Sequence, residues 1–118
     1  ALKPIAKTLS ATLQILDAAH ERNVPCFCAD LTVNPLMADW NKNVACRISP
    51  LPGVKVGVVE VNGGQNYRNW NEMKTLHPTP SGSWTEPRQG VYRLDETFYQ
   101  TSGGVLLPPE KYQAFLDV

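Results

Sequence analysis

Residues 24–36 read Val24-Pro-Cys-Phe-Cys-Ala-Asp-Leu-Thr-Val-Asn-Pro-Leu36, and they decide the expected fold. The apolar run is short enough for a buried strand, and Asn34-Pro35 breaks it where a new helical pattern begins. Side chains of a strand alternate between its two faces, so Cys26, Cys28 and Asp30 fall on one face. The carboxylate then stands at the C-terminal end of the strand, where α/β proteins carry their chemistry. Asp30 is therefore the first candidate functional residue.

Amphipathic helices are predicted on both sides of this strand. The first covers residues 8–23, with Thr8 as N-cap and Asn23 in the left-handed position that ends many helices. The second begins at Asn34, with Pro35 in the first helical position. Each helix has one apolar stripe at spacings of three and four, formed by Leu9, Leu13, Leu16, Ala19 and His20 in the first and by Met37, Trp40, Val44, Ala45 and Ile48 in the second.

Residues 54–61, Val-Lys-Val-Gly-Val-Val-Glu-Val, predict a second buried strand because β-branched residues favour strands. Glu60 lies at its C-terminal end. The order helix-strand-helix-strand is typical of a parallel sheet. Two parallel strands with their helices cannot cover both faces of a sheet or close a barrel. We therefore expect the chain to be the C-terminal part of a larger α/β protein, folding against upstream sequence or another chain.

The second half of the chain predicts shorter elements. Tyr67, Trp70 and Met73 indicate a short helix, and residues 77–89 form a long loop rich in Pro, Gly, Ser and Thr. Residues 90–94 and 104–107 read as short strands, and Pro109 opens a last helix. This divides the chain into residues 1–76, the terminal βα units, and residues 77–118, a loop and a strand and helix tail.

Composition restricts the classes of function. With 118 residues the chain fits one domain, and its 11 basic and 11 acidic residues leave it neutral, so no field attracts nucleic acid or anionic lipid. No apolar run approaches the roughly 18 residues of a membrane span, and residues 1–7 lack the apolar segment of a signal peptide. We expect no nucleic-acid partner and no membrane partner.

The three cysteines do not form a disulfide framework, which favours a reducing, cytoplasmic setting. Cys26, Cys28 and Cys46 could bind a metal together with His20 or His77. However, a lone C-x-C is a weak zinc signal, and buried cysteines behave as small hydrophobic residues. We therefore expect three free thiols and no structural metal.

The order of elements resembles the C-terminal third of enolase-superfamily proteins of the mandelate racemase and muconate lactonizing enzyme type. The resemblance covers nearly the whole chain, from the helix at 8–23 through Val24–Asp30, the helix with Trp40 and Val54–Gly64 to Tyr92-Arg-Leu and Ser102-Gly-Gly-Val-Leu-Leu. It implies an α/β fold in which this chain supplies the last two βα units of a (β/α)-barrel. Residues 24–30 would be the seventh strand and 54–61 the eighth, followed by a tail that returns to a capping domain.

The resemblance also implies an activity. It indicates a lyase or dehydratase, or an epimerase or racemase, that abstracts a proton alpha to a carboxylate with Mg²⁺ held by acids outside this chain. Glu60 matches the family's eighth-strand carboxylate, which donates to the enolate intermediate. The histidine base of the seventh strand is absent from the segment around Asp30, and Lys3 stands near the place of the acid that orients it.

Two interpretations stay open. In the first, the chain belongs to an enzyme, with Glu60 and Asp30 as candidate catalytic residues; Asp30 would orient a base or bind substrate, unless it only caps the following helix. In the second, the protein is a non-catalytic relative that uses the barrel mouth for binding or assembly. The expected partners are a small carboxylate and another chain or the N-terminal part, and a homo-oligomer is one form such assembly could take.

Overall fold

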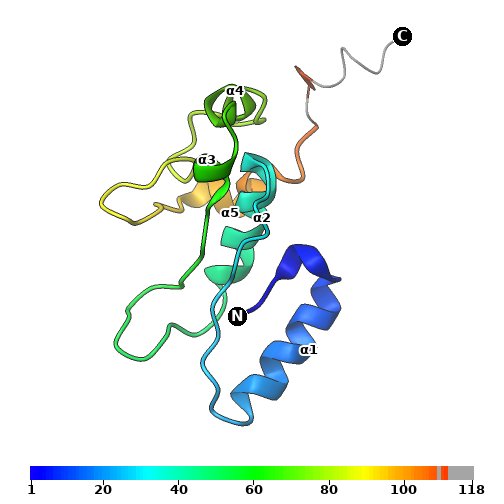
Figure 1. The fold of residues 1–118 in the computed structure, drawn as a ribbon, viewed down its shortest axis with the longest axis vertical. Coiled ribbons are helices and arrows are strands. Elements are labelled where there is room, and N and C mark those ends of the chain that lie inside the picture. Colours follow the sequence, from blue (N-terminus) through cyan, green and yellow to red (C-terminus); the bar gives the residue numbers. More distant parts are fainter. Residues whose placement is uncertain (109, 112–118) are drawn as a thin grey trace.

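Helix α2 (Pro35–Ala45) runs through the middle of the computed structural model, which describes residues 1–108, 110 and 111 (Figure 1). It packs against the 3₁₀ turns η1 (Pro4–Ala6) and η2 (Ser102–Gly104) and against helix α4 (Trp70–Thr75). The remaining helices are α1 (Leu9–His20), α3 (Gly63–Asn66) and α5 (Glu96–Thr101). Within the described residues no helix has both the length and the apolar character that a membrane crossing requires.

The prediction that this chain forms part of a (β/α)-barrel is wrong. Helix makes up 43% of the structure and extended residues 5%, and the described residues form no sheet, whereas barrel units need strands. Leu2, Cys28 and Val59 lie side by side, joined by two single parallel bridges, Leu2 to Cys28 and Cys28 to Val59. The segments predicted as strands are therefore neighbours, but each pairs at one residue only.

Local backbone features limit this pairing. Proline has no N–H to donate to a ladder, and Pro4 and Pro25 lie close to the bridged residues on two of the three segments. On the third segment, Gly57 lies against the C-terminal turn of α2, where an added Cβ would stand 2.1 Å from the carbonyl oxygen of Ala45. The segment is also not buried as predicted, since Val54 and Val56 are 40% and 53% exposed.

The strands predicted in the second half are absent as well. In the segment 90–94, Val91 makes one antiparallel bridge to Arg88. In the segment 104–107, Gly104 ends η2 and turns follow. The helix predicted from Pro109, with Tyr112, Phe115 and Leu116, falls largely outside the described residues.

The predicted helix ends are confirmed. The Thr8 side chain accepts a hydrogen bond from Ala11 N at 3.2 Å, and the Asn34 side chain accepts one from Met37 N at 2.9 Å. Asn23 has a φ of 55°, and it ends α1 in a Schellman motif: Asn23 N–H bonds to the carbonyl of His20, and the next N–H bonds to the carbonyl of Ala19.

The apolar stripe predicted for α1 is only partly buried. Leu16 and Thr12 are buried, whereas Leu9, Leu13 and Ile15 are each more than 40% exposed. Helix α2 is covered on nearly all sides, and its buried residues include four polar ones: Asp39, Asn41, Lys42 and Asn43. The apolar core joins α1, two of the bridged segments and the end of α2 through Leu2, Leu16, Cys26, Cys28, Val44, Ala45 and Ile48, and Val59 of the third segment packs against it.

Candidate functional site

Asp30 and Glu60 lie close together, at the ends of two bridged segments. Asp30 is 3% exposed, and its backbone N–H donates to Glu60 Oε2 at 3.0 Å. The Asp30 carboxylate accepts three backbone N–H groups: Leu31 at 2.7 Å, Val33 at 3.2 Å and Asn62 at 2.9 Å.

These bonds give both carboxylates a structural task. Asp30 ties its own turn to the chain after the third segment, and Glu60 holds the Asp30 backbone from the other side. Lys3, which the sequence left without a role, donates to the carbonyl of Asp30 at 3.0 Å. The side chains thus join all three segments at one point. Catalysis by Glu60 or Asp30 stays a prediction, and neither residue lines the cavity described next.

A second polar cluster gathers around Asp39 on α2. Its carboxylate accepts from Lys42 Nζ at 2.6 Å, from His77 Nε2 at 2.8 Å and from Trp84 Nε1 at 3.0 Å. Asp39, Lys42, His77 and Trp84 are each at most 4% exposed. A buried carboxylate with three donors is fully satisfied, so this cluster fixes the loop of residues 77–89 on α2.

Lys42 is the charged centre of the cluster. Besides Asp39, its amine donates to the carbonyl oxygen of Trp84 at 2.9 Å and lies 3.9 Å from the centroid of the Tyr92 ring. Burial lowers the pKa of this amine below its usual value of 10.5, and the negative charge of Asp39 opposes that shift.

His77 is held in one tautomer. The Thr79 backbone N–H donates to His77 Nδ1 at 2.9 Å, so Nδ1 carries a lone pair and we assign the ring hydrogen to Nε2. That hydrogen points to Asp39, and the imidazole is therefore neutral in this arrangement.

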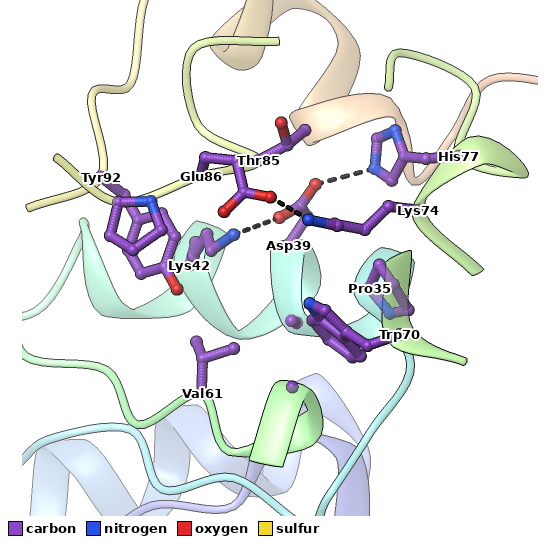
Figure 2. Close-up of a pocket in the computed structure, with 13 residues that line it drawn as sticks. Pro35, Asp39, Lys42, Val61, Trp70, Lys74, His77, Thr85, Glu86 and Tyr92 are labelled. Atoms are coloured by element: carbon purple, nitrogen blue, oxygen red, sulfur yellow. Dashed lines mark hydrogen bonds and ion pairs between the residues drawn. The ribbon is translucent and has the colours of Figure 1, made fainter. Parts of the chain in front are cut away.

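A cavity of about 180 Å³ opens beside this cluster (Figure 2). Lys42 and Asp39 line one side, and Lys74 and Glu86 face them as an ion pair. The Lys74 side chain is 22% exposed and that of Glu86 is 61% exposed, so the pair lies where solvent can reach it. Trp70, Val61 and Tyr92 complete the wall with apolar surface.

The magnesium that the resemblance implies would be held by acids outside this chain, so it stays a prediction. The part of the chain that the structure describes contains no group of three His, Cys, Asp or Glu side chains able to hold a metal ion. Both oxygens of Asp30 are engaged by backbone N–H groups, which leaves this carboxylate poorly suited to a metal. The cysteines Cys26, Cys28 and Cys46 are free.

Little in the sequence pattern indicates this cavity. Neither Asp39 nor Lys42 was among the predicted functional residues. His77 was considered only as a metal ligand. Trp84 lies in the long loop predicted for residues 77–89 and is 1% exposed. The one local signal is the spacing of Asp39 and Lys42, three residues apart on a helix.

No protein-family model, no curated protein and no solved structure matches this chain.

Proposed function

We propose that this chain binds a small carboxylate in the cavity beside α2, with Lys74 as the principal contact. The observation that carries the proposal is the ion pair of Lys74 with Glu86, because it places a carboxylate group inside the cavity wall already. Glu86 would be the internal group that a ligand carboxylate replaces.

The exposure of this pair supports the exchange. An exposed ion pair contributes only about 0–1 kcal/mol, so parting Lys74 from Glu86 costs little. The buried pair of Asp39 and Lys42 is different, because separating it would leave a charge without water or a partner. Lys42 would therefore stay in place, paired with Asp39, when the ligand binds.

Binding is tested by titrating the labelled protein with butanoate and following backbone amide chemical shifts by NMR. We expect saturable shifts at Lys74, Thr85 and Glu86. Lys74→Gln should abolish them because it removes the cation. Glu86→Gln should tighten binding by a factor of about two to five, since it removes the competing carboxylate at little other cost.

Arg22→Gln is the matched control, because Arg22 forms another exposed ion pair, with Glu21 at 3.6 Å, away from the cavity. This variant should bind butanoate as the parent does. The proposal is wrong if Lys74→Gln keeps the shifts, or if the Arg22 variant loses them equally.

A second candidate function is proton transfer at the bound carboxylate, the reaction class of enolase-type lyases and isomerases. The observation that favours it is Lys42, a buried amine with a lowered pKa in the wall of the same cavity. A neutral Lys42 amine would take the proton from the carbon beside the carboxylate. The electron pair left behind would delocalise onto the carboxylate next to Lys74. The proton would then return to carbon in an isomerase, or a neighbouring group would leave in a lyase.

This candidate is tested with L-lactate in deuterated buffer, by NMR observation of the hydrogen on its second carbon. Proton transfer predicts exchange of this hydrogen for deuterium, and its loss in Lys42→Met. The same variant should still bind butanoate, provided that circular dichroism shows a folded chain. Binding without any exchange would leave the chain a carboxylate-binding protein, which is the non-catalytic alternative.

With three free thiols, we also propose a reducing, cytoplasmic setting.

A further inference from the structure

A second cavity, of about 550 Å³, lies at the other end of α2. Its wall combines the C-terminal turn of α2 with the segments 48–59 and 90–94 and with α5. Most of its lining is apolar, contributed by Ile48, Val56, Val58, Val91, Leu94 and Tyr99. This volume is in the range of sites for small molecules, whereas the first cavity, at about 180 Å³, is below that range.

The two cavities share a wall. Lys42 and Tyr92 line both of them, and the Lys42 amine lies over the Tyr92 ring. On α2, the first cavity is lined by residues from Pro35 to Lys42 and the second by Lys42 and Ala45. Because Lys42 lines both cavities and the ten steps of helix from Pro35 to Ala45 span roughly 15 Å, the cavities lie end to end within the length of one elongated ligand.

We propose that the ligand of this protein is an elongated carboxylate, with its carboxylate at Lys74 and its apolar body in the second cavity, passing Tyr92 on the way. This rests on the proposed carboxylate site and extends it to a class of ligand. The polar cavity supplies the charge and the apolar cavity supplies the burial, and Tyr92, half-buried on the outer segment 90–94, offers an aromatic face between them.

Lys55 allows the opposite orientation to be tested. It lines the second cavity, so a ligand placed the other way round would set its carboxylate there. Lys74 is favoured because it already holds a carboxylate group, that of Glu86.

The experiment compares phenylbutanoate with butanoate, which share the carboxylate and differ in the ring. We expect the parent protein to bind phenylbutanoate at least about tenfold more tightly, because the ring removes apolar surface from water. Val56→Gln should remove most of this gain and leave butanoate binding unchanged. Val54→Gln is the matched control: Val54 is similarly exposed on the same segment but does not line the cavity, so both affinities should stay.

Each outcome separates the two proposals. If neither ligand binds, the carboxylate site itself is wrong. If both bind with equal affinity, or if Val54→Gln and Val56→Gln act alike, the carboxylate site stands and the elongated ligand is wrong. If Lys55→Gln weakens phenylbutanoate while Lys74→Gln does not, the ligand lies in the opposite orientation and the proposal fails.

Discussion

Two asparagines on α2 show how differently one residue type is used. Asn43 Nδ2 donates to the carbonyls of Asp39 at 3.1 Å and Ser102 at 2.7 Å, and its Oδ1 accepts from Arg47. Asn41 is fully buried, and neither polar atom of its amide has a hydrogen-bond partner among the described residues. A buried amide without partners costs stability, so Asn41 is a weak point in an otherwise satisfied helix.

We therefore predict opposite effects of the same substitution. Asn41→Leu should raise the free energy of unfolding by about 1 kcal/mol, since leucine has the same branching without the polar atoms. Asn43→Leu should lower it by about 1–3 kcal/mol, because two carbonyl groups lose their donor. Urea denaturation measures both. Equal losses in the two variants would mean that the Asn41 amide is in fact hydrogen-bonded.

Cys28 gives the chain a predictable weakness at alkaline pH. The thiol is fully buried, and burial raises its pKa from 9.0 to about 11, with smaller contributions from Cys26 and Cys46. Between these values the unfolded chain releases the proton while the folded chain keeps it. The contribution of this thiol to the free energy of unfolding is therefore fully present below pH 9 and is lost as the pH rises towards about 11.

This prediction is measured by urea denaturation at a series of alkaline pH values. Cys28→Ala should be less stable at neutral pH, because it leaves a cavity, but should lose less stability than the parent across that window. The pKa of Lys42 is lowered on folding, so its contribution to stability rises with pH, opposite to that of Cys28. Because parent and Cys28 variant both contain Lys42, comparing them cancels this contribution. Parallel curves for parent and variant would contradict the assignment.

At the scale of elements, the start of α2 depends on one side chain. Asn34 caps the helix through Met37 N, and Pro35 occupies the first position. Asn34→Ala should lower the free energy of unfolding by about 0.5–2 kcal/mol, whereas Asn34→Asp keeps an acceptor and should cost much less. Thermal denaturation compares the three chains. If the Ala and Asp variants melt alike, the cap does not contribute.

The helix ends could be predicted from sequence because their signals are local. Thr8, Asn23 and Asn34 each act within five residues of their partners. Strands were predicted that do not form, because the pairing of a segment depends on residues far along the chain. The pattern of residues 54–61 contains no sign that Gly57 would pack on α2 and leave Val59 the one bridged residue.

The same dependence on residues far apart in the sequence explains why the candidate site could not be predicted. Asp39 meets His77 and Trp84 across 38 and 45 residues, and no local spacing encodes such a contact. Asp30 and Glu60 lie together although they are 30 residues apart in the sequence. They do so because the segment that contains Cys28 ends at Asp30, and the segment that pairs with Cys28 ends at Glu60. What the sequence did not show is that backbone N–H groups occupy the Asp30 carboxylate.

At the scale of the whole molecule, one carboxylate joins separate parts of the chain. Asp39 on α2 holds His77 and Trp84 of the long loop, and Trp84 Nε1 also donates to the carbonyl of Gly103 in η2 at 3.2 Å. The N-terminal part is attached to α2 elsewhere, through the apolar core around Leu16 and Cys28. The two attachments share α2 but use different forces, so they should respond separately to a change in charge.

Asp39→Asn should therefore loosen one side of the molecule only. The substitution keeps the shape, removes the charge that pairs with Lys42 and leaves one acceptor oxygen where the carboxylate had two. We expect faster hydrogen exchange at the loop amides Gly82 and Thr85, which bond within the loop, and unchanged exchange at Thr12 and Glu21 in and beside α1. Mass spectrometry of peptides from native-state exchange distinguishes the two regions. Equal acceleration in both would show a single cooperative unit, in which α2 transmits the loss of one buried charge to α1.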